Sequence, residues 1–239
     1  MKNLFLAFFT LVLAFTASAQ YDPKALEILD AMSAKYKSIP SFEANFSVVL
    51  TNDVEKINET FKGKMTVKGD KFRMILPEQE VINNGSTIWT YLPDAKEVNI
   101  DNYDPSSEDV NPSKIYDLYK KGFKYLYLQE RMEGGVMCEE IDLVPEKKDA
   151  QFFKIKMLIN KKSKNVQSWT MFDKGGNRYK YSITAFTPDS SVEDTYFSFD
   201  PKKYPGVEVI DLRWSPLSVI RNRNAPYLST AKRLITFNG

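Results

Sequence analysis

The sequence predicts a mainly β (α+β) protein in which one large antiparallel sheet curls onto helices. Apolar and polar residues alternate along about ten or eleven short segments, with the period of two that half-buried strands have. Short turns rich in Gly, Asn and Asp separate these segments, so neighbours in the sequence should pair antiparallel. No motif recurs at a fixed interval, which argues against a propeller or a solenoid.

The N-terminal segment predicts export. An apolar run at residues 4–15 is followed by a small-x-small pattern that ends at Ala19, where a signal peptidase would cleave. We therefore expect residues 1–19 to be removed and the mature chain to be soluble outside the cytoplasm. A membrane anchor is the alternative, but the run is about twelve residues long and a spanning helix needs roughly 20.

The first element of the mature chain should be an amphipathic helix over residues 22–37. Asp22 is a good N-cap, and Pro23 suits the first helical position. Apolar residues then recur at helical spacing as far as Tyr36.

An antiparallel meander should follow the helix. Gly69-Asp70 marks a tight reversal, and Asn84-Gly85 is the strongest short hairpin signal in the chain. The alternating segments are residues 42–48, 61–67, 72–76 and 88–91.

The second half of the chain predicts a short aromatic helix and further strands. The helix should begin at Pro112 and end at Gly122, because proline suits a first helical turn and glycine a C-terminal cap. The strands should be residues 123–129, 136–144, 152–159, 166–172 and 178–186.

Composition excludes several kinds of chemistry. The sequence has no histidine, and Cys138 is its single cysteine. There can therefore be no Ser-His or Cys-His nucleophile pair, no histidine-containing zinc site and no intramolecular disulfide. Glu140 and Asp142 alternate with Ile141 as a solvated strand face would, so they do not indicate a catalytic pair. We expect no catalytic residues, no metal ligands and no cofactor.

Charge is balanced over most of the chain and basic at its end. When Lys2 and the last 26 residues are left out, 28 Lys and Arg face 31 Asp and Glu, so we expect no nucleic-acid partner. We place one domain at residues 20–213. Residues 214–239 hold four basic and no acidic residues and lose the alternation. This tail is disordered, a lineage-specific extension or an artefact of the gene model, and its basic residues could also contact anionic lipid.

The inward apolar surface of such a sheet exceeds what two short helices can cover. Its strands are rich in Phe, Tyr, Trp and Met. A cavity for an apolar ligand would account for the excess, and a closed core of interdigitated aromatic side chains is the alternative. Periodicity alone does not choose between them.

Several stretches of the sequence together carry a family resemblance. They are SFEANFS (residues 41–47), GKMTVKGDKFRMILP (63–77), NGSTIWTYLPDAKEV (84–98), and a closing stretch with FSFDP (197–201) and PGVEV (205–209). In this order and spacing they resemble the periplasmic outer-membrane lipoprotein carriers of LolA type, from Asp22 through Arg213. The resemblance implies an unclosed antiparallel half-barrel with helices as a lid. Its concave hydrophobic face would take the acyl chains of lipoproteins in transit.

The same resemblance implies a function and partners. The protein would be a soluble periplasmic carrier, not an enzyme, that moves lipoproteins from the inner to the outer membrane. Its partners would be acylated lipoproteins, the inner-membrane lipoprotein-releasing transporter and an outer-membrane acceptor, and it would act as a monomer. A module that binds lipid or another hydrophobic ligand, or that senses the state of the envelope, is the alternative on the same half-barrel.

The resemblance also implies site residues. The lipid-binding side chains would be Phe46, Met65, Phe72, Met74, Trp89 and Tyr91, and the lid would present Ile115, Leu118 and Tyr119. Proteobacterial members often carry an arginine just before the turn where Gly69 stands here, and that arginine ties the lid shut. Arg73 is the candidate for this latch. An ordinary solvent-facing arginine is the alternative, because Arg73 shares a strand face with Lys71 and Ile75.

Overall fold

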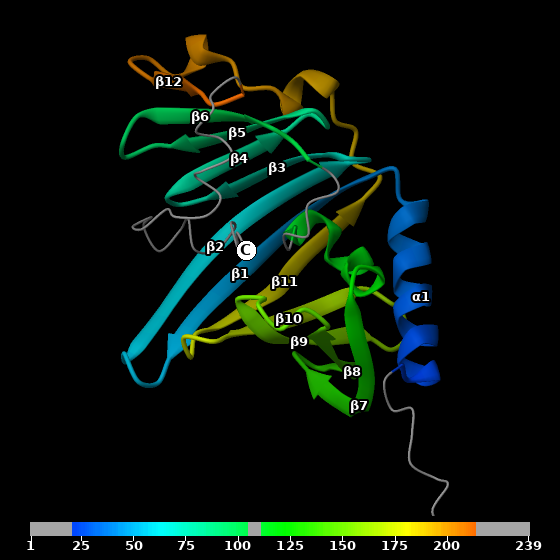
Figure 1. Cartoon of the computed structure of the whole chain (residues 1–239). Coiled ribbons are helices and arrows are strands. Elements are labelled where there is room, and N and C mark those ends of the chain that lie inside the picture. Colours follow the sequence, from blue (N-terminus) through cyan, green and yellow to red (C-terminus); the bar gives the residue numbers. More distant parts are fainter. Residues whose placement is uncertain (1–20, 105–110, 214–239) are drawn as a thin grey trace, which may run out of the picture.

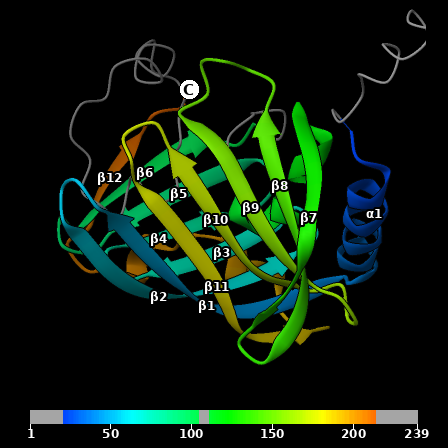
Figure 2. The ribbon, with the colours of Figure 1, turned by 90° about the horizontal axis from the view of Figure 1, so that it is seen from below.

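The computed structural model describes residues 21–104 and 111–213 and confirms the predicted fold class. One sheet of 12 strands runs in the order β12-β6-β5-β4-β3-β2-β1-β11-β10-β9-β8-β7, and its two end strands do not meet. The sheet curls into an unclosed half-barrel, and α1 lies along one side of it (Figure 1). Figure 2 shows the strands side by side in this order, from β12 at one edge to β7 at the other.

The elements have the following bounds. The helices are α1 (Pro23–Ser38) and the 3-10 helices η1 (Pro112–Lys120), η2 (Asp194–Phe197) and η3 (Pro201–Lys203). The strands are β1 (Ser41–Asn52), β2 (Ile57–Lys68), β3 (Lys71–Leu76), β4 (Gln79–Asn83), β5 (Thr87–Leu92), β6 (Glu97–Asn102), β7 (Phe123–Glu133), β8 (Val136–Pro145), β9 (Phe152–Asn160), β10 (Val166–Asp173), β11 (Arg178–Pro188) and β12 (Glu208–Asp211).

Helix α1 forms for the predicted reasons. The side chain of Asp22 accepts hydrogen bonds from the backbone N–H of Lys24 at 2.8 Å and of Ala25 at 3.4 Å, which satisfies two of the free donors of the first turn. Pro23 occupies the first turn, where its missing N–H costs nothing. The helix ends before Pro40, which disfavours helical geometry in the residue that precedes it.

The sheet contains more strands than the alternation predicted. The short strand β4 was not separated from its neighbours in the sequence, because the link from β3 to β4 is only Pro77 and Glu78. Strand β12 pairs parallel with β6, whereas we expected antiparallel neighbours throughout. A parallel pair needs a long crossover, which the closing segment, defined here as residues 194–204, helps to supply.

The two faces of the sheet carry different clusters of apolar side chains. The concave face forms the larger cluster, to which α1, η1 and strands on both sides of β1 contribute. The convex face of β4–β6 forms a smaller cluster around Ile82, Val98 and Phe199. The closing segment, drawn in orange in Figure 1, covers this second cluster.

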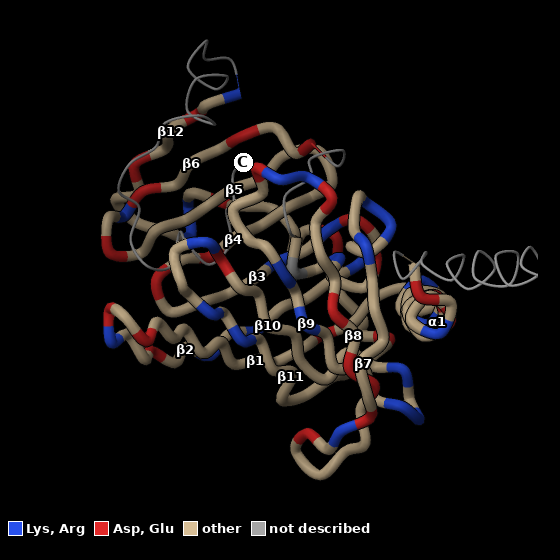
Figure 3. Tube along the Cα trace, turned by 60° about the horizontal axis from the view of Figure 1, so that its bottom comes forward, with Lys and Arg blue, Asp and Glu red and all other residues tan. Residues whose placement is uncertain are grey.

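Positions of basic and acidic residues are interspersed along the chain (Figure 3). Within residues 21–104 and 111–213, no helix combines the length and apolarity that crossing a membrane requires.

Candidate functional site

The first wall of the concave face comes from β1–β4. Strand register places Met74 opposite Met65 and Phe72 opposite Val67, and directly opposite residues of antiparallel strands point to the same face. The predicted site residues Phe46, Met65, Phe72 and Met74 all lie here and are buried.

A glycine makes room for one of these aromatic side chains. Gly63 lies opposite Phe46, and a Cβ atom on Gly63 would lie 2.5 Å from Cζ of Phe46 and 2.8 Å from Cδ2 of Leu76. The Phe46 ring therefore packs directly over the glycine backbone, and no larger residue fits at this position without movement of the wall.

The prediction that Trp89 and Tyr91 belong to this wall is wrong. Register pairs Trp89 with Ile82 and Tyr91 with Glu80, whereas Phe72 and Met74 pair with Asn83 and Val81. Trp89 and Tyr91 therefore point to the convex face. The Tyr91 ring lies 4.6 Å from the Tyr204 ring, centroid to centroid, under the closing segment. A two-residue periodicity cannot by itself say which face of a strand is concave.

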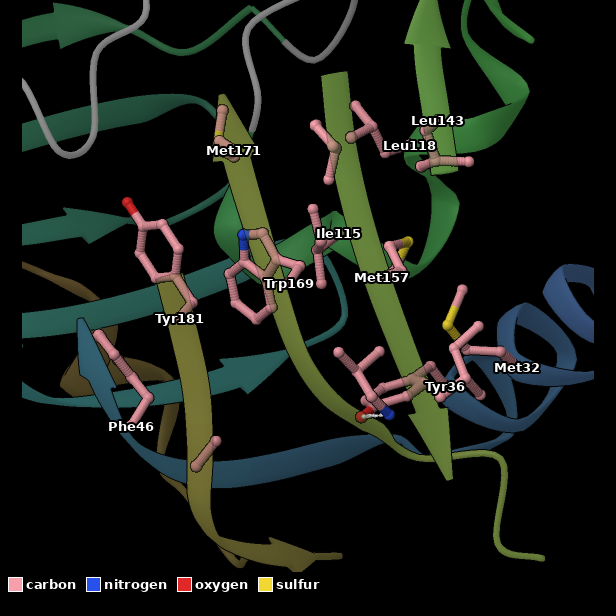
Figure 4. Packing of buried hydrophobic residues seen from close by; sticks show 14 of the residues in the cluster. Met32, Tyr36, Phe46, Ile115, Leu118, Leu143, Met157, Trp169, Met171 and Tyr181 are labelled. Atoms are coloured by element: carbon pink, nitrogen blue, oxygen red, sulfur yellow. Dashed lines mark hydrogen bonds between the residues drawn. The ribbon is translucent and has the colours of Figure 1, made fainter. Parts of the chain in front are cut away.

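The second wall comes from β8–β11 and was not selected from the sequence. Trp169 and Tyr181 lie opposite each other in register and their rings stack 4.7 Å apart, with 4° between their planes. Met157 of β9 lies beside Trp169 of β10, and Met171 lies two residues after Trp169 on β10 (Figure 4). Alternation in the predicted strands 166–172 and 178–186 was the available signal. This alternation alone does not mark the two strands as part of a site, and the stretches that carry the family resemblance lie elsewhere in the chain.

Methionine is concentrated on the concave face. Five of the eight methionines of the chain are buried in this one cluster, and they come from α1 and both walls: Met32, Met65, Met74, Met157 and Met171. Methionine is unbranched and polarisable, so it adapts to ligands of varied shape with little loss of contact. The lining is therefore suited to rearrangement.

Helix η1 covers this face at the place where the sequence predicts a lid, and it is called the lid from here on. The predicted lid residues Ile115, Leu118 and Tyr119 are buried in the concave cluster. The helix is of the 3-10 type and has non-helical backbone angles at Lys114, instead of the regular two-turn helix that we expected. Tyr116 of the lid stacks on Tyr36 of α1 with ring centroids 4.9 Å apart.

Polar contacts fasten the lid to α1. Asp117 of the lid accepts a hydrogen bond from Ser33 Oγ at 2.6 Å and pairs with Lys37 Nζ at 3.1 Å. Lys120 Nζ lies 2.9 Å from the same carboxylate, and the Tyr119 hydroxyl donates to Asp30. Burial alone would raise the pKa of Asp117, but the contacts with Ser33, Lys120 and Lys37 outweigh it and lower that pKa below its usual value.

A second fastening joins the lid to the first wall. Lys114 Nζ of the lid lies 2.7 Å from Oδ1 of Asp70, in the turn between β2 and β3. Burial opposes the charged form of Lys114, but the hydrogen bond to Asp70 and nearby negative groups raise its pKa above the usual value. This ion pair joins η1 to the turn that contains Gly69, near which the family resemblance predicts a latch.

Arg73 is not the latch. It points to the convex face, where its Nη1 donates to the Tyr196 carbonyl oxygen at 2.9 Å and its Nη2 donates to the Tyr204 hydroxyl at 3.1 Å. Its Nε pairs with Glu80. Arg73 thus holds the closing segment against the sheet and is neither the lid latch nor a free solvent-facing arginine.

The acidic residues of β8 are structural, and the solvated face expected for them is partly wrong. Glu140 is buried, where Lys156 and Gln129 donate hydrogen bonds to its carboxylate. Burial would raise the pKa of Glu140, but these contacts lower it. A carboxylate held in its ionised form by a paired lysine is typical of a structural ion pair on a sheet.

An open groove of about 810 Å³ lies over the middle of β1 and β2 and the adjoining ends of β3–β5. Its lining includes the convex-face residues Lys64, Ile75 and Tyr91 as well as Phe46 and Leu76 of the concave face. The inward side chains of the concave face are buried. A ligand on the concave face would therefore take the place of contacts that this face now makes with itself and with the lid.

Together, the curved unclosed sheet, its apolar methionine-rich face and its lid define a protein that binds a hydrophobic ligand. The chain belongs to the family described as outer membrane lipoprotein carrier protein LolA, whose sequence profile matches residues 37–200. That description names a carrier and no catalytic activity. No curated protein sequence matches the chain.

Several solved structures are similar to this chain at low sequence identity. An uncharacterised conserved protein from Thermus thermophilus is 13% identical, with a TM-score of 0.54 over 79% of this chain and 99% of that one. A LolA superfamily protein from Nitrosomonas europaea is 11% identical, with a TM-score of 0.42 over 74% of this chain and 98% of that one. The lipoprotein LppX from Mycobacterium tuberculosis is 11% identical, with a TM-score of 0.45 over 72% and 99%.

Proposed function

We propose that this protein is a periplasmic carrier that shelters the acyl chains of lipoproteins on its concave face and moves them from the inner to the outer membrane. The observation that carries the proposal is the continuous apolar face, with two walls, a lid and five methionines in one cluster. Membership of a carrier family supports it. No covalent chemistry is part of the proposal.

The cargo makes a large demand on an apolar face. Each methylene removed from water contributes about 0.8 kcal/mol, so a lipid anchor of some 40 methylenes needs shelter worth on the order of 30 kcal/mol outside a bilayer. A carrier must nearly match this value and then release the anchor. Displaceable methionines and a weakly fastened lid serve both requirements, because side-chain contacts within the empty site offset part of the gain on binding.

The proposal includes a location and partners. Export through the N-terminal signal sequence would bring the chain to the periplasm. There an inner-membrane lipoprotein-releasing transporter would load it, and an outer-membrane acceptor or the membrane itself would unload it. The carrier would act as a monomer, with no nucleic-acid partner.

Native mass spectrometry of the protein purified from its own envelope tests the proposal. The expected result is a population whose added mass equals that of an acylated protein or its lipid-modified peptide. Copurification of free lipid alone would instead favour a lipid-binding module on the same half-barrel. Recovery of the protein with no acylated species after gentle extraction would contradict both.

A further inference from the structure

Among the described residues, the concave face contains two buried hydrogen-bond donors that have no partner. Nε1 of Trp169 on the second wall has none, and neither has Nδ2 of Asn83 on β4 of the first wall. The side chains of both residues are almost completely buried. Burying an amide or indole N–H without a partner costs free energy, so folded proteins rarely leave one in place without a reason.

Both donors belong to the ligand-binding face. Trp169 lies in register between Met157 and Tyr181, all three in the concave cluster (Figure 4). Asn83 lies opposite Phe72 on one side and Ile88 on the other, so it shares the face of Phe72. The Asn83 Oδ1 atom accepts from the Gly85 N–H at 2.6 Å, which fixes the amide and leaves its NH₂ group as the free end.

The chemistry that satisfies such donors is a carbonyl oxygen carried by an otherwise apolar ligand. A plain hydrocarbon would leave both N–H groups unpaired. A charged headgroup would have to be stripped of water inside an apolar face, which is far more costly than burying a neutral ester. Ester and amide carbonyls accept hydrogen bonds and remain neutral.

We propose that Trp169 Nε1–H and Asn83 Nδ2–H donate hydrogen bonds to the ester or amide carbonyls of an acylated ligand. This inference rests on the proposed function and adds a specificity to it: the site selects acyl-linked chains over ether-linked or free hydrocarbon chains. The acyl linkage is common to a lipoprotein anchor and to a phospholipid.

The test compares two probes that differ only in their carbonyls, dipalmitoylglycerol and its ether counterpart dihexadecylglycerol. Affinities for the wild-type mature protein and for Trp169→Phe are measured by displacement of a fluorescent fatty acid. The expected result is a roughly three- to tenfold preference of the wild type for the ester, consistent with one or two modest hydrogen bonds. In Trp169→Phe the ratio of the two affinities should fall towards one, whatever the change in their absolute values.

A second measurement needs no variant and therefore does not depend on whether Trp169→Phe folds. In ¹⁵N-labelled wild-type protein, the indole N–H resonance of Trp169 should move downfield with the ester and not with the ether. The indole of Trp89 is an internal control, because it lies on the convex face and should not respond to either probe.

The outcomes separate the inference from the proposed function. Equal affinity for ester and ether, with an unmoved Trp169 resonance, would overturn the inference and leave the hydrophobic site intact. Binding of neither probe would overturn the inference together with the proposed function. Competition between a tripalmitoylated cysteine peptide and phosphatidylglycerol then assigns the carbonyl contact to a lipoprotein anchor or to a phospholipid.

Discussion

Lys114 of the lid and Asp70 of the β2–β3 turn form an ion pair of 2.7 Å that bridges the lid and the first wall. The side chains are 31% and 75% exposed, so the pair contributes at most about 1 kcal/mol to stability. A weak contact at this place is consistent with a lid that must open and close, because the two states of such a lid should differ by only a few kcal/mol.

Lys114→Ala should therefore loosen the lid without unfolding the protein. We expect the free energy of unfolding to fall by less than about 1 kcal/mol. Hydrogen exchange of the η1 amides and release of a bound fluorescent fatty acid should both become faster. Lys71→Ala is the matched control, since Lys71 pairs with Asp194 at 2.7 Å in the closing segment. Unchanged exchange in η1 would show that the pair is not a latch, and the swap Asp70→Lys with Lys114→Asp should restore slow release if it is.

Fastening of the lid should depend on pH only at the extremes. The folded-state pKa of Asp117 is lowered, so its stabilising contribution is complete above its ordinary value of 3.8 and is lost as the pH falls further. The folded-state pKa of Lys114 is raised, so its contribution is complete below 10.5 and is lost as the pH rises further. Hydrogen exchange of η1, corrected for its intrinsic pH dependence, should be constant between about pH 5 and 9. In Asp117→Asn the increase in η1 hydrogen exchange at acid pH should be smaller than in the wild type. A transition in η1 exchange near neutral pH would contradict the role given to Asp117 and Lys114.

Arg73→Ala should affect stability and not the lid. Its side chain is 17% exposed and that of Glu80 is 12%, so the substitution leaves a poorly solvated carboxylate and frees the closing segment. We expect a loss of about 1–3 kcal/mol in the free energy of unfolding. Exchange in η1 and the ligand release rate should stay at their wild-type values. Faster ligand release from Arg73→Ala would instead indicate that Arg73 helps to hold the lid closed.

Gly63→Ala should disturb the first wall by overpacking. The new methyl group would meet the Phe46 ring and Leu76, and overpacking of this kind costs roughly 1–3 kcal/mol. The double variant Gly63→Ala with Phe46→Leu should recover part of the loss, as measured by urea unfolding. Additive losses in the double variant would mean that the two residues are not coupled as the structure indicates.

The fold was largely accessible from the sequence because it depends on alternation and turn chemistry, which are local. The caps at Asp22 and Pro23 and the reversal at Gly69 are examples. The face on which a side chain lies was not accessible in the same way. Trp89 and Phe72 both lie in segments with clear alternation, so the pattern alone does not distinguish their faces. The closing segment comes more than 100 residues after Trp89, and it covers the Trp89 side of the sheet to form a second, separate core.

The contact between η1 and the β2–β3 turn could not be found from the sequence for a related reason. Arg73 lies close to this turn in the sequence but points to the convex face, whereas Lys114 lies in η1 and reaches Asp70 only through the folded path of the chain. The second wall was missed because the resemblance directs attention to the first half of the sheet. Trp169 and Tyr181 carry the same alternation and were available in the sequence.

The central claim is that the concave face, and not the convex one, holds acyl chains. Site-specific photocrosslinking in living cells tests it most directly, with a photoreactive phenylalanine analogue at Phe72 or at Ile75 of the same strand. Phe72 is 4% exposed on the concave face, and Ile75 is 40% exposed on the other. The account predicts crosslinks to acylated lipoproteins from position 72 and none from position 75. Equal crosslinking from both positions, or crosslinking from position 75 alone, would contradict it.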